Sequence, residues 1–229
     1  LDWIPVLDKA YEIKYPAEED LANWQPLQEY LEVLTDKDGI ADYEQAVSLL
    51  NMENAVDHNL FIMLSYGCDN NRRKNTFFLA EWGGNANPGY TMIKIPWDCN
   101  ATWGNFWRRG EEFNNTIYEP VRITDPNLWS EDMKSLLLCR TDEIGEMMTR
   151  SWSELRRDIL SQERLVAMRD GEFSYLHGSG AYDRNYRLWP NGTAYWDDRY
   201  IYEYVEGRLA YLDDYFETPW LDETPALDY

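Results

Sequence analysis

The amino-acid sequence predicts an α+β fold that is mostly helical and has one β-hairpin at its centre. Two apolar runs rich in strand-forming residues, 76–82 and 92–96, carry this prediction. Residues 83–89 lie between them and have the glycine, asparagine and proline content of a turn. Apolar residues at helical spacing occur on both sides of the hairpin, so we expect helices to surround it.

The segments before the hairpin are expected to be mostly helical. Acidic residues 18–20 predict the first turn of a helix that leucines at helical spacing continue to residue 34. A similar apolar pattern predicts a shorter helix over residues 43–50. Residues 54–66 are more apolar and predict a buried helix that leads directly to Asp69. Residues 10–15 alternate between polar and apolar types before a proline, so they predict a short strand.

The segments after the hairpin are expected to form further helices and one long loop. The helices are predicted over residues 132–138, 142–162 and 195–216, and the loop over residues 174–192. At 229 residues the chain suits one domain, which we place at residues 1–217. Residues 218–229 contain prolines and acidic side chains and predict a peripheral tail.

Composition excludes several classes of function. The formal net charge of −21 repels phosphate, which argues against nonspecific binding to nucleic acid or to anionic membranes. A nucleotide can still bind if a divalent cation links its phosphates to carboxylates. No apolar run reaches the length of a membrane span. The first residues carry no signal peptide and resemble the middle of a longer protein.

The cysteines and one histidine offer few candidate ligands. Cys68, Cys99 and Cys139 do not have the spacing of a metal site. Cys68 and Cys99 each adjoin an aspartate at one outer end of the hairpin, so either a disulfide or two buried thiols fits. His58 lies in the predicted buried helix and is expected to be a core or interface residue rather than a ligand.

Polar residues gather at the outer ends of the predicted hairpin. Asp69 and Asn75 precede its first strand, and Asp98 follows its second strand. Since a hairpin brings its outer ends together, these side chains can face one another. Phosphoryl transfer requires a carboxylate for the hydroxyl proton and oxygen ligands for Mg²⁺. The alternative is that the three residues only cap turns, as Asp and Asn often do.

Several stretches resemble the CotH family of atypical kinases. Residues 95–104 (IPWDCNATWG) form the most specific part of this likeness, which runs from about residue 10 to residue 216. The other stretches are residues 11–16 (YEIKYP), 74–79 (KNTFFL), 150–156 (RSWSELR) and 205–213 (VEGRLAYLD). The resemblance implies a divergent protein-kinase-like fold, of which this chain is the mostly helical C-terminal lobe, with the metal site on the hairpin.

The resemblance also implies roles for individual residues. Asp69 corresponds to the catalytic aspartate, and Asn75 and Asp98 correspond to metal ligands for Mg²⁺ or Mn²⁺ with ATP. The family usually has a second acid where this chain has Asn100, which keeps an oxygen ligand but loses a charge. The interval from Asp69 to Asn75 is one residue longer than is usual in the family, so Asn70 or Asn71 can shift the alignment.

The resemblance leaves the nucleotide-binding lobe unaccounted for. The β-rich N-terminal lobe with its phosphate-binding lysine is not evident, and Lys14 is the nearest candidate for nucleotide binding. We therefore expect a second chain or a missing N-terminal segment beside residues 10–15. Without it, the net charge of −21 predicts weak binding of Mg-ATP.

Two functions follow from these observations. The first is an ATP-dependent protein kinase that phosphorylates Ser or Thr of a spore-coat or surface protein, as bacterial members of the family phosphorylate spore-coat proteins. The second is a non-catalytic surface or scaffold module that binds protein or carbohydrate partners, which the 11 Trp and 17 Tyr also suit. Both readings imply an extracellular location or the surface of a spore or cell.

Overall fold

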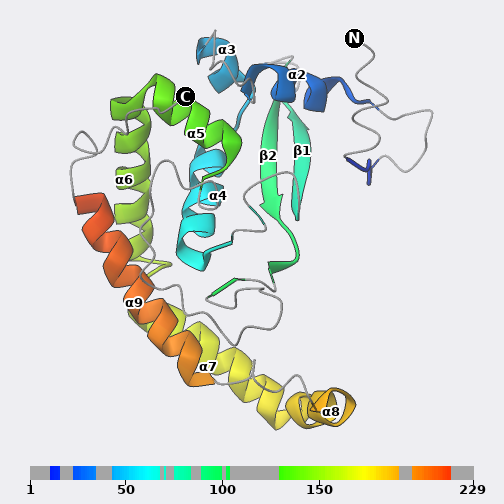
Figure 1. Cartoon of the computed structure of the whole chain (residues 1–229), viewed down its shortest axis with the longest axis vertical. Helices are drawn as coiled ribbons and strands as arrows, with labels where there is room; N and C mark the ends of the chain where they lie inside the picture. The colour runs from blue at the N-terminus through cyan, green and yellow to red at the C-terminus, as the bar shows by residue number, and fades with distance from the viewer. Residues whose placement is uncertain are drawn as a thin grey trace.

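The computed structural model describes residues 11–15, 23–34, 43–67, 70, 75–83, 89–99, 102–103, 129–190 and 198–217. These residues form helices around one two-stranded antiparallel sheet (Figure 1), which confirms the predicted α+β fold. The strands are β1 (Thr76–Trp82) and β2 (Tyr90–Pro96). The helices are α2 (Gln25–Leu34), α3 (Tyr43–Ser48), α4 (Met52–Ser65), α5 (Glu131–Cys139), α6 (Thr141–Arg157), α7 (Gln162–Gly178), α8 (Ala181–Leu188) and α9 (Asp198–Glu217).

The hairpin is paired from end to end. Thr76 is opposite Pro96 and Trp82 is opposite Tyr90, and the Gly83 N–H donates to the Gly89 carbonyl at 2.9 Å. On its other edge, β2 makes a parallel bridge between Met92 and Leu50, just before α4. The hairpin is therefore anchored to the chain segment that begins α4.

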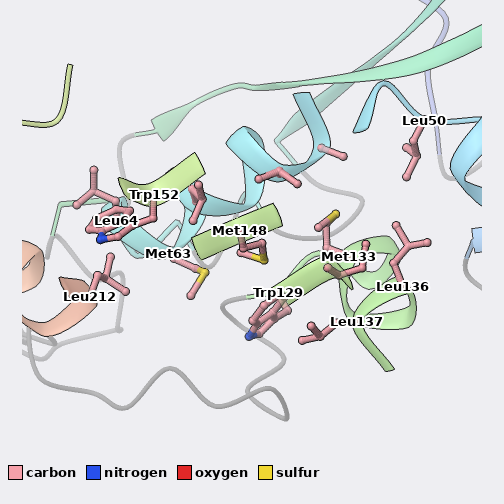
Figure 2. Close-up of a cluster of buried hydrophobic side chains, with 14 of the residues drawn as sticks. Leu50, Met63, Leu64, Trp129, Met133, Leu136, Leu137, Met148, Trp152 and Leu212 are labelled. Atoms are coloured by element: carbon pink, nitrogen blue, oxygen red, sulfur yellow. The ribbon is translucent and has the colours of Figure 1, made fainter. Parts of the chain in front are cut away.

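Helix α4 is the central helix of the core. Its N-cap, Asn51, accepts a hydrogen bond from the Asn54 N–H at 3.1 Å, which fixes where the helix begins. Apolar side chains from α4, α5, α6 and α9 pack together, as Figure 2 shows for Met63, Met133, Met148 and Leu212. This burial is the main stabilising term for the fold.

Strand β2 buries a lysine and exposes an isoleucine. Lys94 is only 3% exposed, whereas Ile95 is 44% exposed. Successive side chains of a strand point to opposite faces, so the strand buries Met92 and Lys94 and turns its isoleucines outward. The apolar run predicts a strand correctly but does not identify its inner face.

Two predicted elements are wrong. Residues 11–15 form no strand; instead the Tyr11 ring packs edge-on against Phe78 of β1, with ring centroids 6.1 Å apart. This segment therefore contacts the hairpin through an aromatic side chain and not through strand pairing. Most of the predicted loop 174–192 is helical, since α7 continues to Gly178 and α8 covers Ala181–Leu188.

The predicted helix 142–162 ends earlier than predicted, and a separate helix begins at residue 162. Helix α6 ends at Arg157, and Ser161 begins α7 by accepting a hydrogen bond from the Arg164 N–H at 3.4 Å. No residue of α7 is buried, so the helix has no apolar face that its periodicity could reveal. Helices α7 and α8 extend away from the hairpin, with α8 at the far end (Figure 1).

The remaining sequence predictions concern the other helices, a membrane span and the C-terminal tail. The helices α3, α4, α5 and α9 lie where the sequence predicts them, whereas α2 ends as predicted but begins at Gln25 rather than near residue 18. Within the described residues, no helix combines the length and apolar character needed to cross a membrane. The predicted tail, residues 218–229, lies outside the described residues, so the domain boundary at residue 217 stays a prediction.

Candidate functional site

The open end of the hairpin brings two of the predicted metal ligands together. Beyond the Thr76–Pro96 pair, the Trp97 N–H donates to the Asn75 carbonyl at 2.9 Å. Asn75 and the Trp97–Asp98 segment therefore lie at one end of the hairpin, as the sequence predicts. Asn75 is half-buried and Asp98 is exposed, so the Asp98 carboxylate faces solvent and is accessible to a cation.

Both residues have an unusual backbone conformation. Asn75 has a φ of 54° and Asp98 a φ of 52°, which is the left-handed region. Tyr66 and Trp103, on the segments that flank these residues, share it with φ of 53° and 55°. Such residues cost about 1–2 kcal/mol each, persist only where their surroundings hold them, and often mark functional sites.

Asn70 joins the loop after α4 to the hairpin end. Its side-chain amide donates to the carbonyl oxygens of Asn75, at 3.0 Å, and Trp97, at 2.5 Å. Its backbone carbonyl accepts from the Thr76 hydroxyl at 2.9 Å. Asn70 is fully buried, so these contacts are shielded from water. This role was not apparent from the sequence, where Asn70 figured only in the alignment of the loop.

The segment after Asp98 is attached to the end of α4. The Thr102 hydroxyl donates to the Cys99 carbonyl at 2.5 Å, and the Trp103 N–H donates to the Ser65 carbonyl at 2.6 Å. The Trp103 ring makes edge contacts with Phe61 of α4 and Tyr204 of α9. These bonds return the chain to the same helix end from which the Asp69 loop departs.

Helix α9 holds that end of α4. The guanidinium of Arg208 is buried and donates from Nε and Nη2 to the Met63 carbonyl, at 2.8 Å and 2.7 Å. The Tyr204 hydroxyl donates to the Leu64 carbonyl at 2.8 Å. Carbonyls at a helix C-terminus lack partners within the helix. A cation at this end is also stabilised by the negative end of the helix dipole. Arg208 falls within a stretch that resembles CotH proteins, but its role was not predicted.

A buried ion pair connects β2 to the core. Lys94 Nζ lies 2.6 Å from Asp132 Oδ2 and donates to the Ser130 hydroxyl at 3.1 Å. Asn59 of α4 accepts from the Ser130 N–H at 3.0 Å. Burial raises the pKa of Asp132, but the Lys94 charge and hydrogen bonds outweigh it and lower the pKa to about 2.

His58 lies beside this ion pair, in the core, as the sequence predicts. It is buried, and neither ring nitrogen hydrogen-bonds with the described residues. Burial and then the Lys94 charge lower the pKa of His58 to about 3, although Asp132 opposes the shift. The imidazole is therefore neutral at ordinary pH.

The remaining predicted site residues have different outcomes. Asp69, Asn71 and Asn100 lie outside the described residues. Lys14 is exposed and pairs with Glu12 at 2.6 Å. Within the described ranges, no group of three or more His, Cys, Asp or Glu side chains could hold a metal ion.

Cys99 is a free thiol, so the alternative of a Cys68–Cys99 disulfide is not realised. Burial, together with the charge of Asp98, raises the pKa of the Cys99 thiol. Since the thiolate is the reactive form of cysteine, this environment disfavours reaction at Cys99.

Comparison with known proteins identifies the family. The model of the family described as CotH kinase protein matches residues 3–212. No match is found among curated proteins or among solved structures. The match covers most of the 229 residues and includes the stretches that carry the resemblance, apart from the last residue of 205–213. The helices around one hairpin agree with the C-terminal lobe of a kinase-like fold. The chain therefore belongs to the CotH kinase protein family.

Proposed function

We propose that this chain is the catalytic part of an ATP-dependent protein kinase that phosphorylates Ser or Thr hydroxyls. One observation carries the proposal: the hairpin places Asn75 and Asp98 at the same end, each with a left-handed backbone. Residues held in this conformation are enriched at functional sites. The family match supports the same class of activity.

The residues at the hairpin end fit a divalent metal. Asp98 offers a carboxylate and Asn75 an amide oxygen, and Mg²⁺ and Mn²⁺ prefer such oxygen ligands. Asn100 adds a further amide oxygen if it takes the place of the usual second acid. When bound, Mg²⁺ or Mn²⁺ would neutralise charge on the ATP phosphates.

Asp69 is assigned the role of the proton acceptor. In phosphoryl transfer the acceptor oxygen forms a bond to the γ-phosphorus while the bond from that phosphorus to the β–γ bridging oxygen breaks, leaving ADP. The hydroxyl proton passes to the Asp69 carboxylate. Asp69 therefore orients the acceptor and is distinct from the residues that bind the metal.

The face of the hairpin next to Asp98 is suited to a nucleotide base. Phe77 is opposite Ile95, and the Phe77 ring contacts Trp97 with ring centroids 5.1 Å apart. Ile95 is 44% exposed and Trp97 is 60% exposed, so this face is open. A base can stack on exposed aromatic and aliphatic surface of this kind. Lys14 remains our candidate for a phosphate contact. Its ion pair with Glu12 is exposed and therefore weak, so Lys14 can leave Glu12 and bind a phosphate at little cost in free energy.

Substitution separates the proposed roles. Asp98→Ala should abolish incorporation of labelled phosphate from ATP and weaken binding of Mn-ATP, because a metal ligand is lost. Asp69→Ala should keep Mn-ATP binding but transfer phosphate about 10²-fold or more slowly, because only the proton acceptor is lost. Both quantities should be measured for each variant, with an acceptor protein rich in serine and threonine.

Glu172→Gln provides the matched control, because Glu172 is an exposed carboxylate on α7, away from the hairpin. This variant should behave as the wild type does in both assays. Wild-type phosphate transfer by both Asp98→Ala and Asp69→Ala would refute the proposed function.

A second candidate function is a non-catalytic module that binds partners at a surface. This candidate is favoured by exposed apolar side chains on α7, on α8 and directly after α8, since large exposed apolar patches often mark binding sites. These side chains are Met168, Tyr175, Tyr186, Leu188 and Trp189. If this candidate is correct, Tyr186→Ser with Trp189→Ser should abolish partner binding, whereas Asp98→Ala should leave it unchanged.

We also propose that the protein acts outside the cell or at a spore or cell surface, on a protein of that location. The family match supports a protein substrate. Fractionation of the producing cells with an antibody to this chain tests the location. Recovery only from the cytosol would contradict it.

A further inference from the structure

Asn70 occupies a position where three parts of the site meet. Its backbone N–H donates to the Gly67 carbonyl at 2.8 Å, which ties it to the end of α4. Its carbonyl accepts from Thr76 at the start of β1. Its side chain reaches Asn75 and Trp97, which flank the hairpin end. Its fully buried side chain thus connects the loop containing Asp69 to both strands.

The orientation of the Asn70 amide is determined by these bonds. The NH₂ group has two hydrogens, and both are directed at backbone carbonyls. Rotating the amide by half a turn would place Oδ1 against those carbonyl oxygens, which repel it. The side-chain oxygen is buried and accepts no hydrogen bond from the described residues.

The two carbonyls that Asn70 holds control the strained residues. The Trp97 carbonyl belongs to the peptide plane that precedes Asp98, so holding this carbonyl restricts the φ of Asp98. The Asn75 carbonyl belongs to the peptide plane that follows Asn75, and it accepts from both Asn70 Nδ2 and the Trp97 N–H. Left-handed conformations at non-glycine residues persist only where such contacts over-determine them.

We propose that Asn70 is a positioning residue for both metal ligands. Its amide holds Asn75 and Asp98 in their left-handed backbone conformations. These conformations set the direction in which each side chain leaves the backbone at the hairpin end. The inference rests on the proposed function, because it assigns Asn70 to the same metal-nucleotide site. It predicts that the residue must donate two hydrogen bonds, which neither aspartate nor alanine can do.

The test compares Asn70→Asp with a control that destabilises the fold elsewhere. Asn51→Ala serves as the control, because Asn51 caps the opposite end of α4 and its loss should lower the melting temperature. Asn70→Asp should weaken Mn-ATP binding, measured by electron paramagnetic resonance of Mn²⁺, by about 10- to 100-fold. The Asn51→Ala protein should bind Mn-ATP as the wild type does.

A second readout needs no ligand. Amide hydrogen exchange of Trp97, whose N–H donates to Asn75, should accelerate in Asn70→Asp and Asn70→Ala but not in Asn51→Ala. Exchange in the middle of the hairpin, at the paired residues Leu79 and Ile93, should change little. These measurements distinguish a local effect at the hairpin end from general loss of stability.

The outcomes separate the inference from the proposed function. If the wild type binds Mn-ATP, Asp98→Ala does not, and Asn70→Asp binds like Asn51→Ala, the positioning role is wrong while the metal site stands. If the protein does not bind Mn-ATP even together with the second chain or N-terminal segment expected beside residues 10–15, the proposed function fails. In that case unchanged exchange at Trp97 in Asn70→Asp overturns the structural part of the inference as well.

Discussion

Lys94 and Asp132 form a buried ion pair, with 2.6 Å between Nζ and Oδ2, that joins β2 to the start of α5. The Lys94 side chain is 2% exposed and that of Asp132 is 1% exposed. Asn54 holds the same strand residue through its backbone, accepting from the Lys94 N–H at 2.7 Å and donating to the Lys94 carbonyl at 3.1 Å. Lys94 is thus attached to the core through both its backbone and its side chain.

Breaking this pair by one substitution should strongly destabilise the protein. Lys94→Met leaves the Asp132 charge buried without its partner, so we expect a loss of about 3–5 kcal/mol in the free energy of unfolding. The double variant Lys94→Met with Asp132→Leu should recover most of this loss, because no charge remains buried. Urea denaturation measures both.

The exposed pair of Arg164 and Asp158 provides a matched control. Their side chains are 58% and 69% exposed and approach to 2.5 Å, so Arg164→Ala should cost at most about 1 kcal/mol. A loss for Lys94→Met no larger than the loss for Arg164→Ala would contradict the account of the buried pair.

The buried His58 should make the protein sensitive to mild acid. The unfolded chain binds a proton at His58 near the ordinary pKa of 6.5, whereas the folded chain does so only near pH 3. Between these values the unfolded state holds more protons, so stability falls as pH falls, by at most about 1.4 kcal/mol per pH unit from this residue. The neighbouring charges are Lys94 on β2 and Asp132 on α5.

Comparing the wild type with His58→Gln from about pH 7 to pH 5 isolates this effect, since glutamine does not titrate. The variant should lose less stability on acidification than the wild type. Asp132 acts in a lower range, because its stabilisation is present above the unfolded pKa of 3.8 and is lost as pH falls through about 2. Parallel curves for the two proteins above pH 5 would rule out the assigned role of His58.

Arg208 should be needed for the end of α4 and for the segments attached to it. Arg208→Met removes two hydrogen bonds to the Met63 carbonyl and should cost about 2–4 kcal/mol, because the carbonyl stays buried. Arg208→Lys keeps a charge but not the planar group, so it should recover only part of this stability. Thermal unfolding measures the order of the three proteins, and equal stability of the lysine variant and the wild type would contradict it.

Asp213 should hold α6 against α9. It accepts from Arg156 Nε at 2.8 Å, Arg156 Nη2 at 2.9 Å and Trp152 Nε1 at 3.0 Å. Because the pair is partly exposed, we expect Asp213→Ala to cost about 1–2 kcal/mol, less than Lys94→Met. Denaturation of both variants under one set of conditions checks this order, and the reverse order would count against it.

The sequence predicts the parts of the fold that local pattern specifies. The hairpin follows from two strand-forming runs around a turn, and α4 follows from its apolar composition. Helix α7 escapes prediction because it buries no residue and therefore lacks an amphipathic pattern. Residues 11–15 have a strand pattern, but pairing requires a partner strand that no local pattern guarantees.

The candidate site divides in the same way. Turn chemistry and hairpin topology suffice to place Asn75 and Asp98 at one end of the hairpin. The roles of Asn70 and Arg208 depend on contacts between residues far apart in the chain, such as Asn70 with Trp97 and Arg208 with Met63. Only the folded arrangement shows these contacts, so residue type alone does not reveal them.

The inward orientation of Lys94 has a consequence for how the hairpin finds its alignment. A shift of one residue along β2 would bury Ile93 and Ile95 and expose Lys94, since strand side chains alternate. Apolar burial alone would favour that shifted hairpin, which would also change the residue that lies opposite Asn75. Asp132 opposes the shift, because its buried carboxylate would then lose its partner. The ion pair therefore favours the observed register of β1 and β2 over the shifted one. This effect does not depend on whether the pair adds to the overall stability of the fold.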